Sequence, residues 1–148
     1  MTDPEFLDAF DSGHLSPAGF HHRDHLRLAW LQVNRLGLEA GSAAVAGGIR
    51  RFATAHGQDR LYHETLTRFW VRIVAHASER GDIPPVGRAR RSLRAAYPPG
   101  PTFAETLEAH PMLLRKDLPL QHWSRETLYG DAAREDWVEP DLAPLPFA

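Results

Sequence analysis

Three histidines and an aspartate fall within five residues, at His21, His22, Asp24 and His25. On a helix, residues three apart lie about one turn from each other, so His22 and His25 would present two imidazoles side by side. A second chemically rich stretch, residues 62–67 (YHETLT), adds a third imidazole and a carboxylate. Both group types bind transition metals, and imidazole also transfers protons near neutral pH. We therefore expect a functional site where these two stretches meet.

The leading prediction is a divalent-metal site formed by His22, His25 and His63. Glu64 would be a fourth ligand, or the general base of a metal-dependent enzyme that acts on a small polar molecule. Other polar side chains near the site would bind that substrate: Tyr62, Thr67 and Arg27. The spacing does not choose among zinc, iron, nickel, manganese and copper. A metal ion with an open coordination position could activate water or hold the substrate directly.

Three other interpretations remain open. His25 or His63 could form a metal-free acid–base pair with Glu64. The histidines could instead be structural, in a non-enzymatic helical module that binds a small molecule or a partner protein. A haem ligated by spare histidines is the third. Arginines at positions 88–94 could bind a phosphate or carboxylate, but a solvated helix face is the preferred explanation.

Helical periodicity predicts the elements that would position these residues. Apolar residues recur at helical spacing over residues 22–36, 38–56 and 61–79, and a short helix is expected near residues 4–11. On a helical wheel, His22 and His25 share the apolar arc of their helix, whereas Asp24 points away. If the first and third of the long helices run parallel, both histidine-bearing ends lie at the same end of the bundle.

The second half of the chain is expected to be less regular. Residues 86–97 form a basic helical pattern, and a capping box at Thr102 and Glu105 opens a helix that runs to about residue 110. Ser124 is expected to cap a last helix through about Glu135. Residues 137–148 contain three prolines and should be extended, with apolar side chains against the body.

Composition limits the class of protein. The chain has 148 residues, a net charge of −2 and no cysteine, so neither disulfides nor thiolate metal sites can form. We expect one all-α domain over residues 1–148, an irregular helical bundle with an extended C-terminal tail. The balanced charge predicts no nucleic-acid or membrane partner. With no signal-peptide core and no long apolar run, a cytoplasmic protein is expected. The oligomeric state is left open.

Several motifs along the chain occur together. They are Phe20 with HxxHLRxAW at residues 22–30, YHETxT at 62–67, WSxExL at 123–128 and WVxPDLxPLP at 137–146. In this combination the chain resembles a family of small, largely uncharacterised bacterial all-α proteins. The resemblance implies no particular reaction. It singles out His22, His25, His63 and Glu64 over the other histidines and carboxylates. His122 departs from the pattern, which has an aromatic residue there.

Overall fold

The computed structural model describes residues 1–78 and 101–147, and within these ranges it contains helices and no strand. The predicted all-α class is therefore confirmed. The α-helices are α1 (Asp3–Ser12), α2 (His22–Leu36), α3 (Leu38–Ala55), α4 (Glu64–Ala77), α6 (Phe103–Ala109), α7 (Arg125–Leu128) and α8 (Asp131–Glu135). Short 3₁₀ turns are η1 (Pro17–Gly19), η2 (Asp59–Leu61), η4 (Pro111–Leu114) and η5 (Leu118–Gln121).

Local capping signals set most helix ends where the sequence predicts them. The Thr2–Glu5 capping box opens α1, and the Thr102–Glu105 box opens α6. Gly37 separates α2 from α3 with φ of 89°, a backbone conformation that residues with a Cβ rarely adopt. These short-range signals need no tertiary contact, so they can be recognised in the sequence.

Two predicted boundaries are wrong, both because the backbone becomes extended. His63 has φ of −137° and ψ of 109°, so α4 begins at Glu64 rather than near residue 61. The predicted last helix is interrupted at Gly130, with φ of −81° and ψ of 164°, which divides it into α7 and α8. The predicted basic segment at 86–97 lies outside the described residues.

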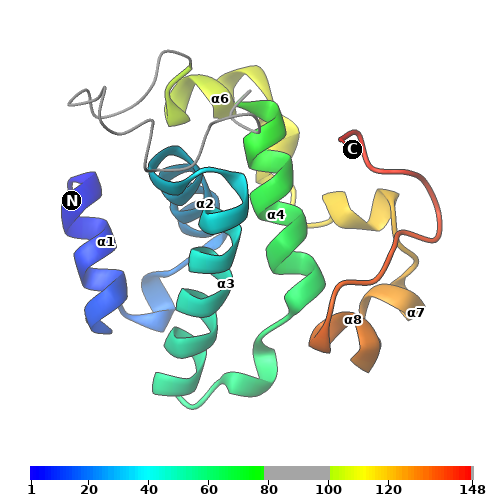
Figure 1. The fold of residues 1–148 in the computed structure, drawn as a ribbon, viewed down its shortest axis with the longest axis horizontal. Helices are drawn as coiled ribbons and strands as arrows, with labels where there is room; N and C mark the ends of the chain where they lie inside the picture. The colour runs from blue at the N-terminus through cyan, green and yellow to red at the C-terminus, as the bar shows by residue number, and fades with distance from the viewer. Residues whose placement is uncertain (79–100, 148) are drawn as a thin grey trace.

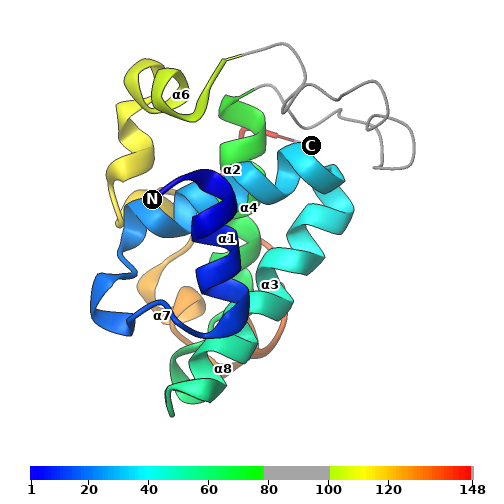
Figure 2. The same ribbon diagram turned by 90° about the vertical axis from the view of Figure 1, so that its left-hand side faces the viewer.

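Helices α2, α3 and α4 pack on one another in the middle of the molecule (Figure 1). Helix α1 packs against α3 on one side, whereas α7, α8 and the C-terminal tail lie on the other side, next to α4. The view turned by 90° shows α6 at the end of the bundle away from α8 (Figure 2). Figure 2 shows α2 running across the bundle while α4 rises along it, so the two helices cross rather than run parallel.

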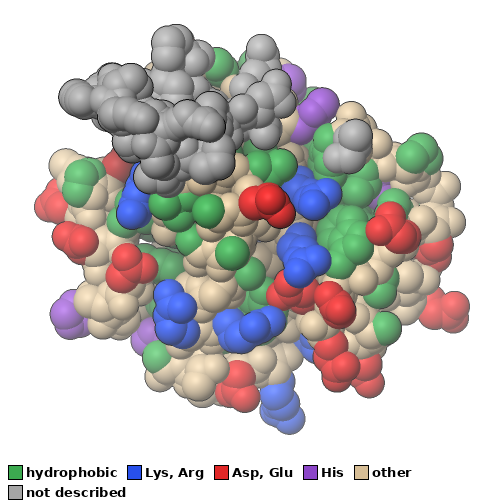
Figure 3. Space-filling view, in the orientation of Figure 1, with side chains coloured by type: hydrophobic (Ala, Val, Ile, Leu, Met, Phe, Trp, Pro, Cys, Tyr) green, Lys and Arg blue, Asp and Glu red, His purple; other side chains and the backbone are tan. Residues whose placement is uncertain are grey.

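The surface combines both signs of charge. On the face shown in Figure 3, basic and acidic side chains lie among one another rather than in separate patches. Within the described residues, no helix has the length and apolar character that crossing a membrane requires.

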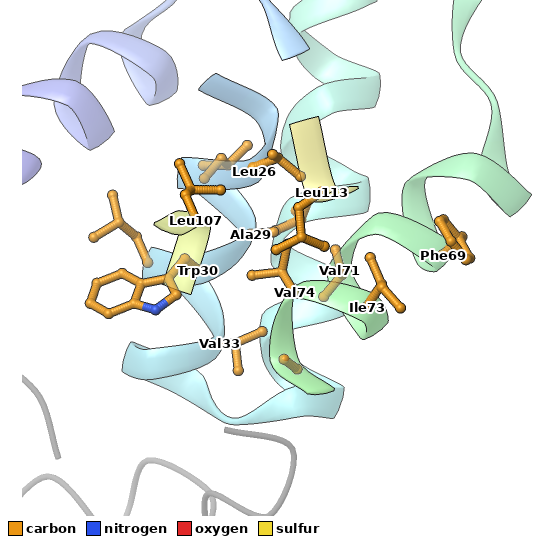
Figure 4. Close-up of a cluster of buried hydrophobic side chains, with 14 of the residues drawn as sticks. Leu26, Ala29, Trp30, Val33, Phe69, Val71, Ile73, Val74, Leu107 and Leu113 are labelled. Carbon is orange, nitrogen blue, oxygen red and sulfur yellow. The ribbon is translucent and has the colours of Figure 1, made fainter. Parts of the chain in front are cut away.

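The core forms where α2 and α4 meet the segment from α6 to η4. Its side chains include Leu26, Trp30, Val74, Leu107 and Leu113 (Figure 4), each 6% exposed or less. The tail after α8 is non-helical, and most of its apolar side chains pack against this core, as expected. Leu142 does not, because it is 60% exposed. Helix α2 is thus fixed on several sides, which restricts how its N-terminal histidines can move.

Candidate functional site

A pocket of about 480 Å³ lies between the N-terminal ends of α2 and α4. We call it the histidine pocket. Its walls combine aromatic and aliphatic side chains with polar groups, and five of the seven predicted site residues line it: His22, His25, Tyr62, His63 and Thr67. The two histidine-bearing stretches, some forty residues apart in the sequence, therefore face one cavity. Apolar wall residues include Phe20, Val45, Ile49, Leu66 and Trp70.

His22 is oriented by a long-range hydrogen bond. Its Nε2–H donates to the Leu113 carbonyl oxygen at 2.8 Å, and its ring stands edge-on to Trp70. Burial lowers the pKa of His22, although the hydrogen bond to Leu113 opposes that effect. The ring is therefore neutral near pH 7, and its Nδ1 keeps an unshared electron pair. A backbone carbonyl that fixes one ring nitrogen is a usual arrangement behind a metal-ligating histidine.

His25 differs from His22 and His63 because its ring makes no hydrogen bond within the described residues. Its ring packs on Phe20, with centroids 4.2 Å apart, and neither nitrogen has a hydrogen-bond partner in the described part of the chain. Burial first, and then the nearby His22 and Lys116, lower the pKa of His25 to about 4, whereas Asp24 opposes the shift. His25 is therefore a neutral group near pH 7 that offers one N–H donor and one nitrogen acceptor.

His63 has a different role, because both of its ring nitrogens are engaged. Nε2–H donates to the Leu128 carbonyl oxygen at 2.6 Å, and Nδ1 accepts the Leu66 amide at 3.2 Å. The second bond caps the N-terminus of α4. Burial lowers the pKa of His63, which keeps the ring in the neutral form that these two bonds require. To ligate a metal, the ring would have to release one of them.

Glu64 lies behind Tyr62 and does not line the histidine pocket. The Tyr62 hydroxyl donates to Glu64 Oε1 at 2.5 Å, and Arg50 donates to the same oxygen at 3.1 Å. Arg68 pairs with Oε2 at 2.7 Å. Burial first, then the hydrogen bond to Glu64 and its charge, raise the pKa of Tyr62, so its phenol stays protonated. The carboxylate thus holds Tyr62 in the pocket wall, and Glu64 itself lines a smaller hollow together with Glu39 and Arg68.

The other two predicted substrate-binding residues are placed differently from each other. Thr67 lines the pocket, but its hydroxyl donates to the His63 carbonyl oxygen at 2.8 Å, which leaves only its oxygen to accept a hydrogen bond. Arg27 lies on the far side of α2, where it pairs with Asp3 at 2.7 Å and covers the Phe6 ring. The structure does not bring Arg27 to the pocket.

Three polar residues outside the predicted site also line the pocket: His21, Lys116 and Tyr129. Lys116 follows η4, the turn that contains the Leu113 carbonyl bonded to His22. One sequence signal could have drawn attention to it, since it is the single lysine among 17 basic residues. The helical wheel places His21 further from the apolar arc than His22 and His25, yet His21 also lines the pocket.

Metal-ligand geometry was the central prediction for these residues. Within the described ranges, no three histidine, aspartate or glutamate side chains are grouped closely enough to hold a metal ion as they stand. His22 Nδ1 and the His25 nitrogens remain uncommitted on the pocket side. These nitrogens can form hydrogen bonds with a ligand, and a metal ion could be bound by at most these two imidazoles.

A second, larger hollow of about 600 Å³ follows the C-terminal tail, between Arg72 and Phe147. None of the predicted site residues lines it.

No protein-family model matches the chain, and neither a curated protein nor a solved structure does. The function is therefore inferred from the geometry of the histidine pocket.

Proposed function

We propose that this protein binds a small molecule with a largely apolar body in the histidine pocket. The observation that carries the proposal is that two helix ends from distant parts of the sequence line one cavity of about 480 Å³. Known ligand pockets have roughly this size, with apolar walls and a few convergent polar groups. Phe20 and Trp70 provide aromatic wall area, and His25 provides uncommitted hydrogen-bonding atoms.

The polar groups of the pocket support binding more directly than catalysis. His63 is committed to the backbone, and Glu64, which was the predicted general base, is bonded to Tyr62 and two arginines. His25 is the group best able to contact a ligand, because its neutral ring can donate one hydrogen bond and accept another.

A pocket-filling variant tests this proposal. Ile49→Trp places a bulky side chain in the pocket wall, whereas Ala40→Trp places the same side chain at an exposed position of α3. Ligand-observed NMR with a small library of aromatic fragments should detect binding to wild type and Ala40→Trp and lose it in Ile49→Trp. If fragments bind all three proteins equally, or bind none of them, the pocket is not a ligand site.

A divalent transition metal is a second candidate, and one observation favours it. His22 has one nitrogen held by a backbone carbonyl and the other free, and His25 is uncommitted at both nitrogens. Such a centre would use these two imidazoles, with water completing the coordination, and it would support a metal-dependent reaction on a small polar molecule.

Calorimetric titration with zinc, nickel and manganese separates this candidate from the first. If a metal binds, His25→Ala should abolish binding. His63→Ala should leave binding largely intact, because both nitrogens of His63 serve the backbone. Wild-type protein that takes up no metal would remove this candidate and leave the small-molecule proposal standing.

A further inference from the structure

The polar lining of the histidine pocket carries one positive charge and, among the described residues, no negative charge. Lys116 supplies an ammonium group, and imidazoles, phenols and a hydroxyl make up the rest. None of the described residues that line the pocket is an aspartate or a glutamate. A cationic ligand would therefore find no counter-charge in the wall, whereas an anionic group would find one.

Lys116 is not committed to any acidic side chain in the described part of the chain. The nearest carboxylate in sequence, Asp117, is bonded through both oxygens to Arg115, at 3.2 Å each. The positive charge of Lys116 contributes to lowering the pKa of both His22 and His25, so the ammonium influences the pocket interior, although the carboxylate of Asp24 acts more strongly on His25 and raises its pKa. An exposed ammonium beside an acid-free pocket is a suitable partner for a ligand anion.

Lys116 is held near the pocket by the same contact that orients His22. The His22 Nε2–H bond to the Leu113 carbonyl joins the N-terminal end of α2 to η4, three residues before the lysine. His25 lines the same pocket, and its ring has an N–H that no described group accepts. A carboxylate has two oxygens, and this arrangement provides a donor for each.

The apolar wall indicates what the rest of such a ligand is. The rings of Phe20 and Trp70, together with Val45 and Ile49, favour an aromatic or branched aliphatic body. A simple inorganic anion would leave this surface uncovered, and a fully polar molecule would lose hydration against it.

We propose that the histidine pocket binds a small carboxylic acid with an apolar body, its carboxylate between Lys116 and the His25 ring N–H. This inference rests on the proposed small-molecule function and specifies its ligand class.

Three probes with one common body test the inference. They are 4-phenylbutyrate, 4-phenylbutanol and 4-phenylbutylamine, which end in an anion, a neutral hydroxyl and a cation. Isothermal titration calorimetry at neutral pH should show the carboxylate binding about tenfold more tightly than the alcohol, and the amine binding most weakly. A tenfold ratio is about 1.4 kcal/mol, close to the lower end of what one charge-assisted hydrogen bond contributes.

Lys116→Met should reduce the affinity for the carboxylate to that for the alcohol and leave the alcohol unchanged. Arg51→Met is the matched control, because it removes one positive charge at an exposed site outside the pocket. It should leave the tenfold ratio intact. An equal loss in both variants would mean that net charge, rather than Lys116, attracts the anion, and would overturn the inference.

A second readout requires no substitution. Because the chain has one lysine, reductive methylation with ¹³C-formaldehyde labels one side chain besides the N-terminus and keeps its positive charge. The Lys116 signal should shift when 4-phenylbutyrate is added and stay unchanged with 4-phenylbutanol.

The outcomes distinguish the carboxylate inference from the broader small-molecule function. Equal binding of all three probes, or preference for the amine, overturns the carboxylate inference and leaves the small-molecule function standing. Binding of none of the probes overturns the inference, and the fragment experiment with Ile49→Trp then decides the broader function by itself.

Discussion

His63 provides the sharpest test of how this site is built, because the structure gives it a structural role where the sequence suggested a metal ligand. Its ring is 8% exposed and joins two elements, capping α4 through Nδ1 and holding α7 through the bond to Leu128. His63→Ala removes a cap worth about 1 kcal/mol. It also leaves a buried carbonyl without its donor, at a cost of about 1–3 kcal/mol. We expect the free energy of unfolding to fall by about 2–4 kcal/mol.

Two conservative variants of His63 divide this loss. Asn is a good capping residue but is too short to reach the Leu128 carbonyl, so His63→Asn should keep the cap and lose the other bond. Gln is long enough to reach the carbonyl but caps poorly, so His63→Gln should keep the bond to Leu128 and lose the cap of α4. Both should lie between wild type and His63→Ala in urea unfolding followed by circular dichroism.

Controls make the result decisive. His76→Ala removes an exposed imidazole from the same helix and should change the stability by less than about 0.5 kcal/mol. If His63→Ala is as stable as wild type, the two ring bonds do not form and the structural role is wrong. If the loss disappears when wild type and variant are both measured in chelator, His63 acts as a metal ligand after all.

Acidification should destabilise the protein, because burial lowers the pKa of His22, His25 and His63 below that of an unfolded histidine. The neutral rings contribute fully to the free energy of unfolding above about pH 6.5, and this contribution is lost as the pH falls toward their folded-state pKa. When the pH is lowered from about 7.5 to 5, the free energy of unfolding in urea should therefore fall by about 2 kcal/mol less for His25→Leu than for wild type. If the free energy of unfolding has the same pH dependence in both proteins, the pKa of His25 is not lowered to about 4. Two glycines of α3 should respond oppositely to alanine in thermal unfolding. A Cβ at Gly41 would lie 2.9 Å from the Gln32 carbonyl oxygen and should destabilise by about 1–3 kcal/mol, whereas Gly47 meets only a flexible arginine and should gain up to about 1 kcal/mol. Stabilisation at both positions would mean that α2 and α3 are not in close contact.

Short-range signals in the sequence determined most of the helical framework. The Thr2–Glu5 and Thr102–Glu105 boxes and Gly37 set helix ends within a few residues of themselves, and α2 has the predicted bounds. The wheel also selected His22 and His25 as inward residues of α2, because helical geometry alone decides which side chains share a face. These inferences required no knowledge of what the face packs against.

Tertiary packing decided the long-range hydrogen-bond partners of the pocket histidines. His22 meets Leu113 and His63 meets Leu128, partners 91 and 65 residues away, and no local pattern encodes such contacts. Glu64 turned away from the pocket because two arginines and the Tyr62 hydroxyl surround its carboxylate. The sequence could identify the residues with chemical potential, but their hydrogen-bond partners depend on how distant helices pack, and the partners determine which groups remain free to bind a ligand.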